Sequence, residues 1–209
     1  MSELWGGFAL PDTAPHLPPD DFLMLRYPKS GALLRELFVR LAAEIPWRQE
    51  SIILYGKCHM QPRLLCWMGD PECAYRYSGI LHKPQPWHPL VSGIRAHVEA
   101  LAGARFNCVL LNHYRDGQDS MGFHADDEPE LGAQPVIASL SLGAARAMHL
   151  RHRRDRALPT QKLVLADGDL LVMRGNSQCD WKHAIPKSRK ALGPRINLTF
   201  RLIRFPSLT

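Results

Sequence analysis

The chain contains the run Arg195-Ile196-Asn197-Leu198-Thr199-Phe200-Arg201-Leu202, in which every odd position is polar and every even position is apolar. Because side chains alternate across a β-strand, the run predicts a strand with one polar and one apolar face. Arg195 and Arg201 would lie about 20 Å apart along that face. One explanation of the polar face is a strand with one side exposed to solvent. The other is a pocket wall in which the two arginines lean toward the two ends of a small dicarboxylate. The run alone favours the wet strand.

Short apolar runs before this strand indicate further strands, because turn-forming residues separate them. They cover residues 106–114, 136–142, 147–152, 163–165 and 170–173. In the first run, Asn112 and Tyr114 form the polar end of an otherwise apolar row. Such a change of polarity occurs at the mouth of a barrel, and more commonly where a strand enters a loop.

Two amphipathic helices are predicted ahead of these strands. The first follows Ser30, a favoured N-cap, and Pro46 limits its far end. The second follows Pro89, and Gly103 stands where a helix C-terminus favours glycine. Helices followed by a series of strands predict an antiparallel, two-layered β core with helices on one face.

The domain organisation is expected to be simple. Residues 1–29 are rich in Pro and Asp and show no periodicity, so we expect an extended lead-in on the surface. Residues 30–209 are expected to form a single domain, a size at which folding buries a sizeable core. The default expectation for the assembly is a monomer.

Composition narrows the classes of function. Among the 209 residues, no apolar run approaches the ~20 residues of a membrane-spanning helix, so no membrane association is expected. The five cysteines are odd in number and include no Cys-x-x-Cys pair, which favours a reducing cytoplasmic setting, or a nucleus in a eukaryote. The net charge of +6 fits either a polyanionic partner or an ordinary basic surface.

A possible metal site comes from His124-Ala125-Asp126 and the distant His183. In an extended segment, His124 and Asp126 point the same way and can share an ion. Two histidines and one carboxylate leave half of an octahedron open, as in non-haem Fe(II) oxygenases. Taken alone, however, a single His-x-Asp is better explained as an acidic surface loop with an unrelated histidine.

The order of these parts resembles the AlkB family of Fe(II)- and 2-oxoglutarate-dependent dioxygenases, which remove alkyl groups from nucleobases. The resemblance rests on Asn112-x-Tyr114, then His124-x-Asp126, then His183, then Arg195-x-Asn197-x-Thr199-x-Arg201. It is strongest to DNA-repairing members in residues 112–128 and 194–201, and it reaches back to about residue 51. It implies a jelly-roll (double-stranded β-helix) core.

The resemblance also implies the roles of individual residues. His124, Asp126 and His183 would be the catalytic iron ligands. The cosubstrate 2-oxoglutarate would be held by Asn112, Tyr114, Arg195, Asn197, Thr199 and Arg201. The implied reaction uses O2, oxidises an N-methyl carbon and yields formaldehyde, succinate and CO2.

The base would be taken out of the stack and held under a lid, which in the family corresponds to residues 51–80 here. The candidate substrate contacts are Tyr55, which would fill the gap left by the flipped base, and Trp67, Tyr75, Tyr77, Asp127 and Glu128. Tyr75 and Tyr77 would share a strand face, and Trp67 would come from the neighbouring strand. Packed core aromatics, and a structural ion pair of Asp127 with an arginine, are the alternative explanations.

The expected substrate is therefore alkylated DNA, single- or double-stranded, carrying 1-methyladenine or 3-methylcytosine. The same chemistry on RNA or on a protein side chain is one alternative, and a non-catalytic nucleic-acid-binding module is another. Basic residues at Arg146, in 151–156 and in 182–190 would contact phosphates, or else form solvated loops.

Overall fold

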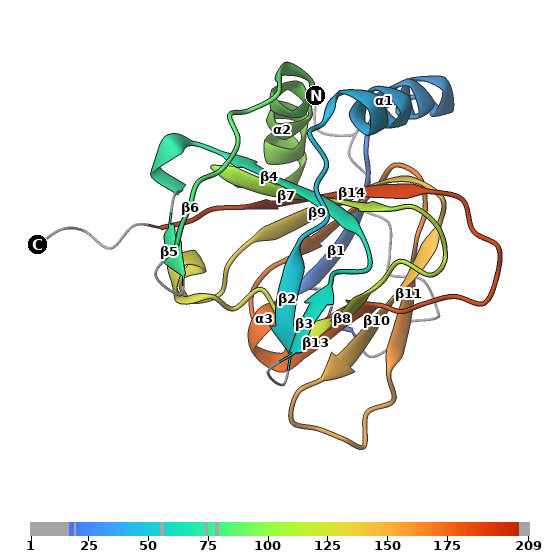
Figure 1. Ribbon diagram of the computed structural model, residues 1–209. Helices are drawn as coiled ribbons and strands as arrows, with labels where there is room; N and C mark the ends of the chain where they lie inside the picture. Colours follow the sequence, from blue (N-terminus) through green and yellow to red (C-terminus); the bar gives the residue numbers. More distant parts are fainter. Residues whose placement is uncertain (1–16, 19, 55–56, 74, 78–79, 205–209) are drawn as a thin grey trace, which may run out of the picture.

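The computed structural model describes residues 17–18, 20–54, 57–73, 75–77 and 80–204. Two antiparallel sheets face each other, and two helices cover the outer side of the larger sheet (Figure 1). The large sheet is ordered β1 (Phe22–Arg26), β12 (Asp169–Met173), β9 (Ile137–Gly143), β14 (Arg195–Arg201), β7 (Cys108–Tyr114) and β4 (Leu64–Gly69). The small sheet is ordered β11 (Gln161–Leu165), β10 (Arg146–His152), β13 (Trp181–Ile185) and β8 (Met121–His124).

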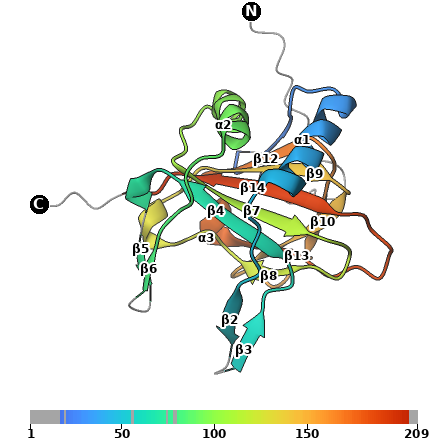
Figure 2. The same ribbon diagram turned by 45° about the horizontal axis from the view of Figure 1, so that its top comes forward.

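The remaining elements lie outside these sheets. Helices α1 (Gly31–Glu44) and α2 (Pro89–Ala102) are the long ones, and α3 (Ser177–Asp180) is a single turn. Short 3₁₀ turns cover Pro71–Cys73 and Pro129–Leu131. Two separate hairpins, β2 (Ser51–Leu54) with β3 (Lys57–Met60) and β5 (Tyr75–Tyr77) with β6 (Ile80–His82), extend from the edge of the body (Figure 2).

Strand β14 lies in the middle of the large sheet and pairs with both β7 and β9. Its apolar residues, Ile196, Leu198 and Phe200, belong to the core that α1 and α2 cover. A second core lies between the sheets and includes Tyr114, Met148 and Trp181. Because both faces of β14 are therefore enclosed, its polar residues are directed between the two sheets.

Local sequence signals explain the ends of both long helices. The Ser30 side chain accepts from the backbone N–H of Leu33 at 3.4 Å, which caps α1. Gly103 ends α2 in the left-handed conformation, with φ of +63°, where a side chain is disfavoured. Both positions are as predicted.

The predicted fold class, an antiparallel two-layered β core with helices on one face, is confirmed. One boundary requires correction. Residues 22–26, assigned to the extended lead-in, form β1 at the edge of the large sheet and pair with β12. Phe22 and Met24 are buried in the core between the sheets, so this segment is an integral part of the β core. Residues 1–16 lie outside the described residues.

Among the residues that the structure describes, no helix has the length and apolar character that crossing a membrane requires.

Gly143 offers a test of how the β9–β10 connection is built. Its φ is +87°, and an added Cβ would lie 2.6 Å from the Pro194 carbonyl oxygen and 2.9 Å from the Phe38 ring. We expect Gly143→Ala to lower the free energy of unfolding by at least about 2 kcal/mol, measured by urea denaturation. Gly93, in α2, has open space around it and is the matched control.

Gly93→Ala is expected to raise stability by about 0.5–1 kcal/mol, because alanine suits a helix better than glycine. Equal stabilities for Gly143→Ala and the unsubstituted protein would contradict this account of the turn.

Candidate active site

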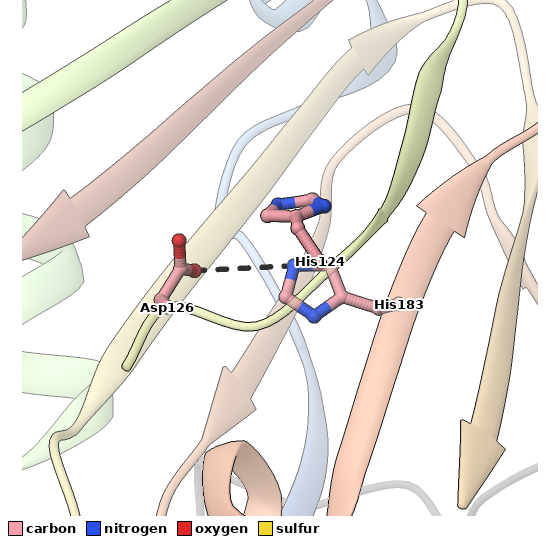
Figure 3. A group of neighbouring side chains, drawn as sticks. All are labelled: His124, Asp126 and His183. Carbon is pink, nitrogen blue, oxygen red and sulfur yellow. Dashed lines mark ion pairs between the residues drawn. The ribbon is translucent and has the colours of Figure 1, made fainter. Parts of the chain in front are cut away.

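The structure brings His124, Asp126 and His183 together between the sheets (Figure 3). His124 ends β8, Asp126 follows two residues later, and His183 is the register partner of His124 on β13. One ligand atom from each residue lies within 4.8 Å of the others. The cluster thus joins one short strand, the loop after it and a neighbouring strand distant in sequence.

The Asp126 carboxylate is buried and is held in one orientation. Its Oδ1 accepts from Nη2 of Arg201 at 2.5 Å, and its backbone N–H donates to Oε1 of Gln178 at 2.9 Å. Burial alone would raise the pKa of Asp126, but the neighbouring Arg201 charge holds that pKa below its usual value. Oδ2 has no hydrogen-bond partner among the described residues. An ionised carboxylate therefore directs one unused oxygen at the histidines.

The two histidines offer ring nitrogens as ligand donors. Burial lowers the pKa of His183 to about 3, so its imidazole stays unprotonated at neutral pH. The Nδ1 of His124 lies 2.9 Å from the Gly122 carbonyl oxygen, which can only accept. This contact leaves Nε2 of His124 as the ligating nitrogen. Two imidazoles and one carboxylate fit a divalent transition metal with open positions for other ligands.

Next to this cluster, the polar face of β14 lines the same pocket. Arg195 is fully buried, and burial lowers its pKa from the usual value, although a guanidinium remains charged. Its Nη2 donates to Ser141 Oγ at 2.9 Å, whereas Nε and Nη1 have no hydrogen-bond acceptor among the described residues. The described residues also offer Arg195 no ion pair. A buried cation with unused donors calls for an anionic ligand.

The rest of this wall is a network of uncharged polar groups. Thr199 Oγ1 donates to Asn197 Oδ1 at 2.9 Å, and Asn197 Nδ2 donates to Ser139 Oγ at 2.8 Å. Asn112 and Tyr114 of β7 line the pocket beside them. The polar face of β14 is therefore a buried pocket wall, and the alternative of a wet strand is wrong.

The proposed base contacts are more widely spread. Asp127 is half exposed and forms an ion pair with Arg153 at 2.6 Å, so the structural alternative holds for this residue. Glu128, also exposed, precedes a 3₁₀ turn. Tyr55 lies outside the described residues, as do the side chains of Tyr75 and Tyr77, whose backbone forms β5.

Trp67 requires a correction. It lies on β4, which pairs with β7 in the large sheet, whereas β5 pairs with β6. It therefore does not come from the strand beside Tyr75 and Tyr77. A run of apolar residues identifies a strand, but it does not identify the strand's partner.

Several contributing residues were missed by sequence reasoning. Ser139 and Ser141 alternate with leucines in β9, a period of two that could have placed them on the pocket wall. Arg63 and Gln178 stand in segments without such a pattern, and only the fold brings them to the site. Arg146, expected in a basic surface cluster, is instead buried and donates to the carbonyls of Asp116, Asp119 and Pro186.

A basic groove lies on the outer side of the small sheet, beside the β10–β11 connection. Its cationic lining is Arg151, Arg153, Arg156 and Lys182. The Arg151 guanidinium stacks on the exposed ring of Phe123, 4.2 Å from its centroid. Phe123 directly precedes His124 in β8, and successive side chains of a strand lie on opposite faces, so the groove lies on the face of the small sheet opposite the His124–Asp126–His183 cluster.

Comparisons with known proteins agree with this geometry. The sequence profile of the 2OG-Fe(II) oxygenase superfamily matches residues 21–201. The alpha-ketoglutarate-dependent dioxygenase alkB homolog 3 of Bos taurus is 41% identical over 175 residues, which cover 80% of this chain and 60% of that protein. The DNA oxidative demethylase ALKBH2 of Homo sapiens is 39% identical over 177 residues, which cover 80% of this chain and 68% of that protein.

The chain therefore spans about three fifths of the length of the alkB homolog 3 proteins that it matches. The solved structure of OsALKBH1 superposes with a TM-score of 0.59 at 17% identity and covers 90% of this chain and 98% of that one. At that identity the superposition supports the fold.

The buried His183 makes a prediction about pH. Its pKa lies near 3 in the fold, against 6.5 ordinarily, so between these values the unfolded chain binds more protons than the folded chain. The metal-free protein should therefore lose stability as the pH falls below 6.5. From pH 7 to pH 5 its free energy of unfolding should fall about 2 kcal/mol more than that of His183→Gln.

Urea denaturation in the presence of EDTA measures both proteins at each pH. Parallel stability curves for the two would show that His183 is not held neutral by burial.

Proposed function

Because the chain belongs to the AlkB family of the 2OG-Fe(II) oxygenase superfamily, we propose that it is a dioxygenase that removes alkyl groups from DNA bases. The single observation that carries the proposal is the His124–Asp126–His183 cluster, in which Asp126 and His183 are buried, beside a buried arginine that lacks an anion. The first feature suits Fe(II), and the second suits the carboxylate of 2-oxoglutarate. The related human protein named DNA oxidative demethylase supports DNA as the substrate.

In this proposal, His124, Asp126 and His183 hold the iron. The unused Oδ2 of Asp126 and the two imidazoles, of which burial keeps that of His183 neutral, are the donor set that Fe(II) takes in this superfamily. With 2-oxoglutarate and O2, the bound iron would supply an oxidation that hydroxylates the N-methyl carbon, so that formaldehyde, succinate and CO2 are released. Arg201 keeps Asp126 ionised and oriented through the 2.5 Å hydrogen bond.

The cosubstrate would lie along the polar face of β14. Arg195 has two unused donor groups for one carboxylate, and Tyr114 lies against its guanidinium, with 5.2 Å from Cζ to the ring centroid. Arg201, Asn112, Asn197 and Thr199 complete the polar lining. Leu110, Met148 and Met173 line the same pocket and exclude water from it.

The base would be held near Asp127 and Glu128, on the rim of the pocket, under the segment 51–80. A 1-methyladenine or 3-methylcytosine ring is cationic, so it suits the Asp127 carboxylate once Arg153 releases it. Trp67, Tyr75 and Tyr77 remain proposed contacts of that ring, and Tyr55 is proposed to fill the gap that the ring leaves in the stack.

The phosphate backbone would follow the basic groove. Arg156 and Lys182 line it without an ion pair among the described residues, so both charges are available to phosphates. Arg151 and Phe123 extend this basic face to β8, on the side of the strand opposite His124. The groove thus accounts for backbone contact without sequence readout.

The first prediction concerns turnover. With Fe(II), 2-oxoglutarate and ascorbate, we expect formaldehyde release from oligonucleotides that carry 1-methyladenine or 3-methylcytosine. His183→Ala and Asp126→Asn should reduce release to background, because each removes one iron ligand. Single-stranded DNA, duplex DNA and RNA, assayed in parallel, rank the strand preference. Succinate without formaldehyde would contradict the substrate, and the absence of both products would contradict the iron site.

The second prediction concerns the groove. Arg156→Gln combined with Lys182→Gln should weaken oligonucleotide binding and reduce the slope of log K against log salt by about 1–2. The matched control is Arg35→Gln with Arg105→Gln, which removes the same charge from exposed positions on the helical side. Equal slopes for the two double variants, measured by fluorescence anisotropy, would contradict a backbone contact in the groove.

A further inference from the structure

We infer that Arg63 is a positioning residue, which orients the Asn112 side-chain amide so that its N–H groups face the bound cosubstrate. The inference rests on the proposed function, since it assigns a partner to the cosubstrate wall of the same pocket. Arg63 follows the β2–β3 hairpin. It lies in the part of the chain to which the family resemblance extends, but it is not among the site residues that the resemblance implies.

The contact between the two side chains is short and buried. Arg63 Nε donates to Asn112 Oδ1 at 2.7 Å, and both residues are less than 10% exposed, at 7% and 2%. An amide has one oxygen and one NH2 group, and Nε–H can only donate. The contact therefore fixes which end of Asn112 is the acceptor, and Nδ2 is left to donate elsewhere. Within the described residues, Arg63 is the hydrogen-bond partner of this side chain.

The position of Asn112 makes this orientation matter. Asn112 is the register partner of Asn197 on β14 and lines the pocket with Arg195 and Arg201. An amide whose NH2 group faces the pocket can donate to an oxyanion, whereas a flipped amide would present its oxygen and repel it. Arg63 thus determines whether this wall attracts or opposes an anionic ligand.

Arg63 itself is held by the elements that carry the site. Its Nη1 donates to the Ser120 carbonyl at 3.4 Å, and the backbone N–H of Ser120 donates to the Pro62 carbonyl at 2.8 Å. Ser120 directly precedes β8, the strand that ends at His124. The backbone N–H of Gln61 donates to the Glu50 carbonyl at 2.8 Å, and this hydrogen bond closes the base of the β2–β3 hairpin. One arginine therefore connects the hairpin base, β7 and the start of β8.

The charge of Arg63 is unusual for a purely structural residue. It forms no ion pair among the described residues, and burial lowers the pKa of its guanidinium. Burying an unpaired cation is costly, and a neutral donor would hold Ser120 and Asn112 at lower cost. A second cation behind the pocket wall instead adds to the attraction that Arg195 exerts on an anion.

The test is the affinity for 2-oxoglutarate, measured by calorimetry under anaerobic conditions on protein loaded with Mn(II). Arg63→Lys keeps the charge but lacks the Nε contact, and we expect it to weaken 2-oxoglutarate binding about tenfold. Asn112→Ala should weaken binding similarly. Arg63→Lys added to Asn112→Ala should have little further effect, since both changes remove one interaction.

Thermal unfolding of each metal-free variant separates positioning from folding. The control is Arg115→Lys. Arg115 forms an ion pair with Asp119, in the loop that leads to Ser120, but it does not line the pocket. We expect that control to leave 2-oxoglutarate affinity unchanged. Additive effects of the two changes, or a lower melting temperature with unchanged affinity, would show that Arg63 is only structural.

The failure of the proposed function has a different signature. If the unsubstituted protein itself does not bind 2-oxoglutarate, the cosubstrate assignment and this inference are both overturned. If it binds and Arg63→Lys binds equally well, the inference alone is overturned.

Discussion

The burial of charge between the two sheets is the constraint on which the rest of this structure depends. Arg195 and Asp126 are almost completely enclosed, and neither would be stable there without partners. Asp126 has Arg201, but one of its oxygens and two donor groups of Arg195 have no hydrogen-bond partner among the described residues. The surrounding apolar cores hold the sheets at a fixed separation, so these groups cannot turn toward solvent. The pocket is thereby organised for a cation on one side and an anion on the other.

Adjacent carboxylates show how the fold separates roles that the sequence presents together. Asp126 is buried and bound to Arg201, whereas its neighbour Asp127 is half exposed and paired with Arg153. The first is fixed and suited to hold a metal. The second can exchange its partner, because an ion pair at the surface is weak. Burial makes a similar distinction between β13 and β8. His183 is buried and neutral, whereas Phe123, which precedes His124 in the chain, is exposed.

The sequence predicted those features that depend on local pattern. Alternation in residues 195–201 placed the polar face of β14, and Ser30 and Gly103 located helix ends, because caps and pleats are properties of neighbouring residues. It did not predict that residues 22–26 join the sheet, or that Trp67 pairs with Leu110 rather than lying beside Tyr75. It also missed Arg63. Partners across strands depend on the whole fold, which no local pattern records.

The most direct test of this account is thermal unfolding of the protein alone, with Mn(II), with 2-oxoglutarate, and with both. If the two buried charge centres share one pocket, 2-oxoglutarate should raise the melting temperature more when Mn(II) is present than when it is absent. The joint shift should therefore exceed the sum of the separate shifts. Independent shifts that merely add, or no shift with either ligand, would contradict a single pocket built for a metal and a dicarboxylate.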